Sequence, residues 1–170
     1  MSRAFVNEDA ATELPLVPAR APLPEGVPNY VTPRGMGLLR AEQTELDAER
    51  ARLVADEPEG AERQHRLAVL DQRLSDLSLR VRSAKMIRAQ PNPGDVVRFG
   101  ACVTLHGADG ETRRYRLVGV DEADAADGRI AFTSPLARAV VGKRVGETVP
   151  FQSGRGEEML TIVSVEYEAG

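Results

Sequence analysis

Few residue types in this sequence could carry out chemistry on their own. The chain has one cysteine, Cys102, and two histidines, His65 and His106. One cysteine cannot form an internal disulfide, and these three residues do not supply the ligands of a structural zinc site. His65 falls in a polar segment and is expected at the surface, whereas Cys102 falls in an apolar pattern and is expected in the core. We therefore expect no stable metal site and no cofactor of the chain's own.

Carboxylates gather in one short stretch, "DEPEGA", which contains Asp56, Glu57 and Glu59. Pro58 and Gly60 interrupt the helical pattern there and predict a tight reversal of the chain. Residue types alone leave two interpretations of this turn open: a solvated acidic surface or a functional carboxylate site.

A stripe of basic residues follows the turn and consists of Arg73, Arg80, Arg82, Lys85 and Arg88. It could meet nucleic acid. However, residues 33–60 carry four arginines against seven acids, and residues 61–88 carry seven basic residues against three acids. This complementarity predicts that about half of the stripe faces the acidic segment instead.

Residues 30–90 are expected to form the scaffold for these charges. Thr32 and Pro33 provide an N-cap and a first helical residue. Leucines then recur every seven residues, at Leu39, Leu46 and Leu53. After the reversal, apolar residues are spaced by three or four, at Leu67, Leu70, Leu74, Leu77, Val81 and Ala84. This spacing is typical of a coiled-coil seam, and the short connection predicts an antiparallel helical hairpin.

Residues 91–170 have a β-rich pattern. Two strand-like runs flank Asp109-Gly110, which is typical of a hairpin turn, and three more runs are "GRIAFTS", "ETVPFQS" and "EMLTIVSVEYE". Between them, Ser134, Pro135 and Gly142 suit the N-cap, the first position and the end of a two-turn helix. We therefore predict an α+β protein whose second domain has a twisted antiparallel sheet and one short helix.

The remaining residues, 1–29, are expected to form a disordered leader because five prolines interrupt every periodic pattern: Pro15, Pro18, Pro22, Pro24 and Pro28. No apolar run approaches the ~20 residues of a membrane span, and the first residues lack a secretion signal, so we expect a cytoplasmic protein. A net charge of -4 favours a protein partner over bare nucleic acid.

Several motifs together resemble the bacterial Gre transcription factors, GreA and GreB. They are "YVTPRGMGLL", "FGACVTL", "RYRLVGVDEAD" and "SPLARAVVGKRVGETV", and the resemblance spans roughly residues 30–168. The segment "VGVDEAD" is closer to GreB. The resemblance implies a hairpin that enters the secondary channel of RNA polymerase and an FKBP-like domain that docks on the rim. It also implies polymerase contacts by Ser134, Pro135, Ala137 and Arg138, with Arg138 able to form a charged fork.

In Gre factors that stimulate transcript cleavage, the hairpin tip carries an acidic D-x-x-E-N-A motif that helps polymerase hold a catalytic magnesium. Asp56 and Glu59 keep the spacing of these acids, but Gly60 stands where the family has Asn, and Pro58 lies between the acids. The resemblance further implies that this first arm is shorter by about nine or ten residues, or ~14 Å. We therefore predict that the chain occupies the channel without efficiently stimulating cleavage.

Three alternatives stay open. The chain could be a true cleavage factor in which Asp56 and Glu59 share the polymerase magnesium. FKBP-like folds also include prolyl isomerases, although an aromatic content of 4% argues against their aromatic-walled pocket. Finally, the hairpin could belong to an adaptor for another protein. The main expectation is a monomeric accessory factor without enzymatic activity of its own, which approaches RNA or DNA only within the polymerase complex and does not contact membranes.

Overall fold

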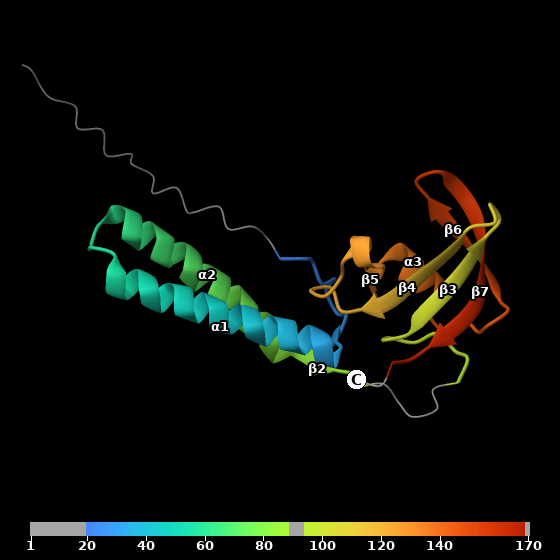
Figure 1. Cartoon of the computed structure of the whole chain (residues 1–170), viewed down its shortest axis with the longest axis horizontal. Helices are drawn as coiled ribbons and strands as arrows, with labels where there is room; N and C mark the ends of the chain where they lie inside the picture. The colour runs from blue at the N-terminus through green and yellow to red at the C-terminus, as the bar shows by residue number, and fades with distance from the viewer. Residues whose placement is uncertain (1–19, 89–93, 169–170) are drawn as a thin grey trace, which may run out of the picture.

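The computed structural model describes residues 20–88 and 94–168, which form a helical hairpin joined to a β-rich body (Figure 1). Residues 1–19 of the predicted leader lie outside this description. Residues 20–28 were also predicted to be disordered, but the structure places them at the base of the hairpin, where Arg20 is paired with Glu42 and Asp121. For residues 20–28, the proline pattern therefore did not indicate these contacts.

The hairpin consists of α1 (Pro33–Asp56) and α2 (Ala61–Ser83), as predicted. Thr32 caps α1, since its hydroxyl oxygen accepts a hydrogen bond from the backbone N–H of Gly35 at 2.9 Å. The seam contains buried leucines from both helices: Leu39, Leu46, Leu53, Leu70 and Leu77. The other predicted seam residues, Leu67, Leu74, Val81 and Ala84, pack partly buried against them. The apolar periodicity therefore identified the hairpin and its contact face correctly.

Charge pairing within the hairpin differs from the prediction. Among the described residues, the ion pair between α1 and α2 joins Arg50 to Asp71 at 2.6 Å, so the base comes from the first arm and the acid from the second. Arg80 belongs to the basic stripe, about half of which was predicted to face the acidic segment. In the structure Arg80 instead contacts Asp121 in the body. Net charge was misleading here because an ion pair depends on the position of each side chain around its helix, which a summed charge does not contain.

Two short strands close the base of the hairpin. β1 (Asn29–Val31) precedes α1, β2 (Ala84–Met86) follows α2, and the two pair in parallel with Tyr30 opposite Lys85. Asn29 is buried, and its amide Nδ2 donates to the backbone oxygen of Arg80 at 2.9 Å. The start of α1 and the end of α2 are thereby held together at the base of the hairpin.

The body contains the five predicted strands: β3 (Cys102–Gly107), β4 (Thr112–Val118), β5 (Arg129–Ala131), β6 (Thr148–Ser153) and β7 (Gly156–Glu166). Their order in the sheet is β5-β4-β3-β7-β6. The α+β class is confirmed, but the sheet is mixed rather than wholly antiparallel, because β5 pairs in parallel with β4. Residues 119–128, which include the 3-10 helix η1 (Ala125–Asp127), return the chain to Arg116, in the second half of β4, and so allow this parallel pairing.

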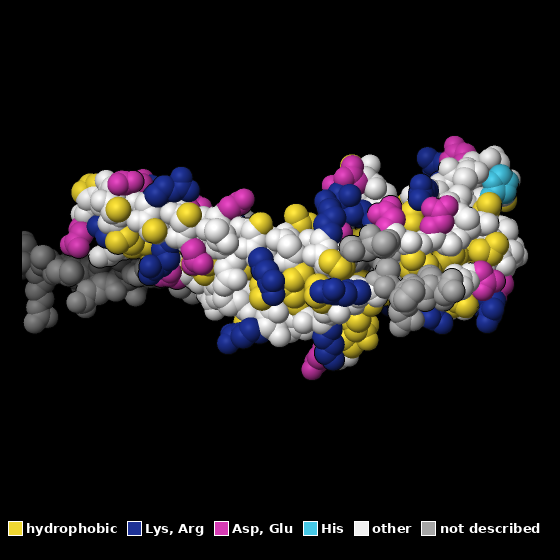
Figure 2. Space-filling model, turned by 60° about the horizontal axis from the view of Figure 1, so that its bottom comes forward, with side chains coloured by type: hydrophobic (Ala, Val, Ile, Leu, Met, Phe, Trp, Pro, Cys, Tyr) yellow, Lys and Arg dark blue, Asp and Glu magenta, His cyan; other side chains and the backbone are white. Residues whose placement is uncertain are grey.

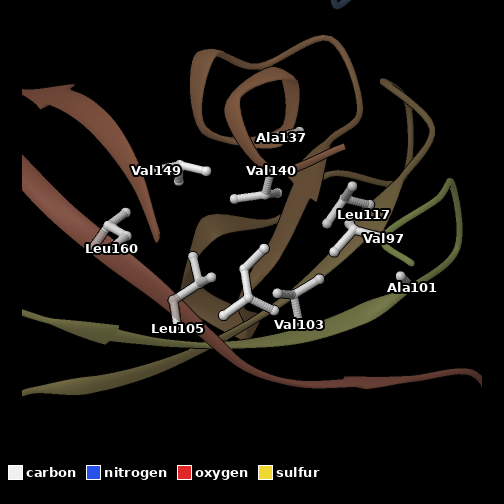
Figure 3. Packing of buried hydrophobic residues seen from close by; sticks show 10 residues of the cluster. Val97, Ala101, Val103, Leu105, Leu117, Ala137, Val140, Val149 and Leu160 are labelled. Atoms are coloured by element: carbon white, nitrogen blue, oxygen red, sulfur yellow. The ribbon is translucent and has the colours of Figure 1, made fainter. Parts of the chain in front are cut away.

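A short helix, α3 (Pro135–Val140), covers one face of the sheet. Figure 3 shows Ala137 and Val140 of α3 pointing toward Val103 and Leu105 of β3. The buried core comprises Val97, Ala101, Val103, Leu105, Leu117, Ala137, Val140, Val149, Leu160 and Ile162. The helix is therefore part of the core on its inner side and exposed on its outer side.

Aromatic and polar contacts join the hairpin to the body. The rings of Tyr30, Phe99 and Phe132 pack together with centroids 5.5 to 5.7 Å apart. Glu122 is buried beneath the start of α1, where it accepts a hydrogen bond from the hydroxyl of Thr32 and pairs with Arg34 at 3.1 Å. A carboxylate in this position is favourable because the N-terminal end of a helix is electropositive.

Candidate functional site

The predicted functional residues lie in two separate places. Asp56 and Glu59 are at the free end of the hairpin, whereas α3 is in the body, at the other end of the molecule (Figure 1). The structure therefore does not bring the acidic turn and the predicted docking helix into one site. Any partner that contacts both must extend along the hairpin.

The hairpin tip is an exposed acidic turn. Asp56 is the last residue of α1, and both Asp56 and Glu59 have exposed side chains. Glu57, between them, pairs with Arg66 of α2, and its backbone oxygen accepts a hydrogen bond from Arg63 at 3.0 Å. The turn itself is thus held by Glu57, while Asp56 and Glu59 are directed to solvent.

The tip does not form a metal site alone. Within residues 20–88 and 94–168, no three His, Cys, Asp or Glu side chains are arranged to hold a metal ion. Two carboxylates can complete the coordination of a magnesium ion that another molecule already holds, because magnesium commonly keeps waters and takes only one or two protein carboxylates. The arrangement is chemically suited to a shared ion.

The helix α3 is capped at both ends. The hydroxyl oxygen of Ser134 accepts a hydrogen bond from the backbone N–H of Ala137 at 3.3 Å, and Pro135 occupies the first turn. At the other end, Gly142 has a φ of 81°, a conformation that favours glycine, and its N–H donates to Val97 at 2.8 Å. Caps at both ends explain why so short a helix is stable.

Three of the four predicted contact residues are accessible, and one is not. Pro135 and Arg138 are exposed and Ser134 is half-buried, but the side chain of Ala137 is completely buried in the core. The Ala137 methyl group faces the sheet and does not reach the outer surface, whereas polymerase contact by this segment stays a prediction. Among the described residues, Arg138 has no ion-pair partner.

Sequence reasoning missed apolar residues beside this helix. Val141 and Val145 are 45% and 42% exposed. By contrast, Val140 is buried in the core and Leu136 packs partly buried against it. We define the α3 surface as Ser134, Pro135, Arg138, Val141 and Val145. Together, an arginine and exposed valines are residue types that protein interfaces use.

The basic stripe, which begins on α2 and continues through β2 to Arg88, has largely exposed members. Arg82, Lys85 and Arg88 are exposed and Arg73 is half-buried, whereas Arg80 is engaged with the body. Figure 2 shows Lys and Arg side chains around an apolar surface in the middle of the molecule, near the region where the hairpin meets the body.

His65 is exposed and Cys102 is buried, as expected.

A cleft of about 550 Å³ lies between the start of α1 and strand β4. Its arginines face carboxylates, with Arg34 paired to Glu122 and Arg116 paired to Glu168. The hydrogen bond and charge of Arg116 hold the pKa of Glu168 below its usual value. Since these positive charges are already neutralised, the cleft does not favour binding of a free anion.

The aromatic residues of the body are distributed rather than gathered around one pocket. Phe99 and Phe132 pack against Tyr30 at the joint. The other three pack partly buried against the core of the body: Tyr115, which also lines the cleft, Phe151 and Tyr167. This arrangement does not favour the prolyl isomerase alternative.

The helices in the described part of the chain contain no segment long and apolar enough to cross a membrane.

Comparisons with known proteins agree on one family. Residues 90–167 match the family described as "Transcription elongation factor, GreA/GreB, C-term". The chain is 37% identical over 161 residues to transcription elongation factor GreB of Pseudomonas aeruginosa, an alignment that covers 87% of this chain and 95% of that protein. It is 39% identical over 104 residues to transcription elongation factor GreA of Nitratidesulfovibrio vulgaris, covering 61% of this chain and 65% of that protein.

Among solved structures, GreA factor homolog 1 of Thermus thermophilus aligns with a TM-score of 0.40 and 18% identity. That alignment covers 81% of this chain and 97% of the Thermus protein.

Proposed function

This chain belongs to the GreA/GreB family of transcription elongation factors and is closer to GreB, and from this premise we propose that it binds RNA polymerase through the α3 surface and places its hairpin in the secondary channel. It acts there as an accessory regulator in the cytoplasm, as a monomer and without a cofactor of its own. We further propose that it stimulates transcript cleavage weakly or not at all.

The length of the hairpin is the observation on which the weak-cleavage proposal rests. α1 has 24 residues and ends at Asp56, so the arm is about 36 Å long at 1.5 Å per residue. The alignment with the Pseudomonas GreB has 161 positions, more than the 87% of this chain that it covers, so the relative has residues without a counterpart here. The family resemblance assigns this difference to the first arm of the hairpin, which is the premise of the proposal. A carboxylate must come within about 2 Å of magnesium to ligate it, and a shorter arm therefore removes that contact.

A transcript-cleavage assay tests this proposal. Backtracked complexes of polymerase should release short RNAs at about the rate of polymerase alone when this chain is added, because Asp56 and Glu59 do not reach the magnesium. The GreB of Pseudomonas aeruginosa serves as the positive control. Robust release that is lost on Asp56→Ala or Glu59→Ala would instead support the alternative of a true cleavage factor.

Arg138 is the residue of the α3 surface with the largest expected contribution to polymerase affinity. We expect Arg138→Ala to weaken binding to core polymerase by at least about tenfold, since loss of a central interface arginine typically costs ~2 kcal/mol. The matched control is Arg155→Ala, which removes an exposed arginine from the turn between β6 and β7. Binding of labelled protein to core polymerase measures both variants, and equal affinities would contradict a specific role of Arg138.

The adaptor alternative makes a different prediction for the same experiment. If the hairpin serves another protein, the parent chain itself will not be retained by core polymerase. This outcome separates the two functions before any variant is compared.

A further inference from the structure

Arg20 connects three parts of the molecule at the hairpin base. One of its terminal nitrogens, Nη2, lies 2.5 Å from Glu42 Oε2 on α1, and the other, Nη1, lies 3.1 Å from Asp121 Oδ1 in the body. The side chain of Arg20 is 21% exposed and that of Asp121 is 9% exposed. The segment that precedes the hairpin is therefore attached to both the hairpin and the body.

Asp121 also binds the second helix. Arg80 Nε lies 3.2 Å from Asp121 Oδ2, and Arg80 Nη2 donates to the backbone oxygen of Ala21 at 2.5 Å. The guanidinium groups of Arg20 and Arg80 therefore share the carboxylate of Asp121, although among the described residues Asp121 Oδ2 accepts no hydrogen bond and pairs with Arg80 by charge alone. Since Arg80 also binds Ala21, the residue after Arg20, these contacts form a polar network that joins residues 20 and 21, α1, α2 and the loop after β4.

The network is charged, and its members are partly shielded from solvent, Glu42 least, with a side chain that is 36% exposed. Partial burial disfavours the charged form of Arg20, but hydrogen bonds and charges from Glu42 and Asp121 outweigh it and raise the pKa of Arg20 above its usual value. Arg80 is 12% exposed on its side chain. Removing one partner from such a network leaves the remaining charges poorly compensated, which is costlier than losing an exposed pair.

Because the network lies at the base of the hairpin, a small change of angle there moves the tip by a large distance. For an arm of about 36 Å, a rotation of ~10° at the joint displaces the tip by about 6 Å. Contacts at the base must therefore fix the angle of the hairpin if the tip is to enter a narrow space reproducibly.

We propose that residues 20–28 form a strap across the joint and that Arg20 is a positioning residue, which fixes the direction of the hairpin through its contacts with Glu42 and Asp121. The strap acts in the free protein, before any partner binds. Its importance for entry into the polymerase channel rests on the proposed function, but the strap itself does not.

The test is a distance measurement between spin labels on the hairpin and the body. Labels are attached to the full chain through His65→Cys on α2 and His106→Cys on β3, two exposed positions, in a Cys102→Ala background. The parent should give one narrow distance distribution. Arg20→Ala should broaden it by several ångströms, consistent with a swing of ~10° or more.

Two further variants distinguish positioning from a general loss of structure. Arg20→Lys, which keeps the charge, should narrow the distribution again toward the parent. Arg40→Ala, which removes an exposed arginine from α1, should leave it unchanged. Helix content measured by circular dichroism should stay the same in all variants, since Arg20 lies outside both helices.

A distribution that stays narrow in Arg20→Ala overturns the proposal, and so does equal broadening in Arg40→Ala. Because polymerase is absent from this measurement, failure of the strap is distinct from failure of the proposed function. The latter fails if core polymerase does not bind the parent chain.

Discussion

Leu77→Ala is expected to lower the free energy of unfolding of the hairpin by about 2–5 kcal/mol. Leu77 is completely buried in the seam between α1 and α2 and belongs to the same cluster as Leu39 and Leu46. The substitution removes buried methyl groups and leaves a cavity that two regular helices cannot close without losing other contacts. Urea denaturation followed by far-ultraviolet circular dichroism measures the loss.

Leu79 provides a matched control on the same helix. It is two residues from Leu77, but its side chain is 57% exposed. Leu79→Ala should therefore change the free energy of unfolding by less than about 0.5 kcal/mol. Similar losses for the two variants would show that the seam does not hold the hairpin together.

The hairpin could be predicted because its signal is local. Leucines at a spacing of seven lie on one side of a helix whatever the rest of the chain does, and Pro58 with Gly60 indicated where the chain reverses. Capping residues fixed the start of α1 at Thr32 and the extent of α3 after Ser134 for the same reason. Each signal involves residues within a few positions of one another.

The joint could not be predicted because its contacts are distant in sequence and have no period. Glu122 binds Thr32 across 90 positions of the chain. β1 and β2 have three residues each, too few for an alternating pattern, and they pair only after the hairpin has brought them together. The acidic residues of "VGVDEAD" are also typical of an exposed turn. Nothing in the sequence therefore indicated that Glu122 is buried.

The helix α3 was predicted from its capping pattern, but its two faces were not separated. Polymerase contact by its outer face stays a prediction. Six helical residues are too few for a periodic pattern to show that Ala137 faces the core while Arg138 faces solvent. The exposed Val141 and Val145 lie at and beyond the end of the helix, where no helical periodicity applies.

Gly119→Ala is the second variant with a large expected effect, because Gly119 is where the body meets the hairpin base most closely. A Cβ atom at this position would lie 2.6 Å from the backbone oxygen of Tyr30 and 3.5 Å from Val31 Cα. Tyr30 belongs to β1, which is held by β2, so the clash cannot be relieved by rotation of a side chain. We expect the free energy of unfolding to fall by about 1–3 kcal/mol.

Gly37→Ala separates this steric effect from the general effect of replacing glycine. Gly37 lies inside α1, is exposed, and a Cβ there would meet no atom within 4 Å. Alanine should therefore stabilise the protein by about 0.5–1 kcal/mol through better helix propensity. Thermal unfolding of both variants should thus shift in opposite directions from the parent. Because the two substitutions add the same methyl group, a Gly119→Ala variant that is as stable as the parent or more stable would mean that β1 does not pack closely against Gly119.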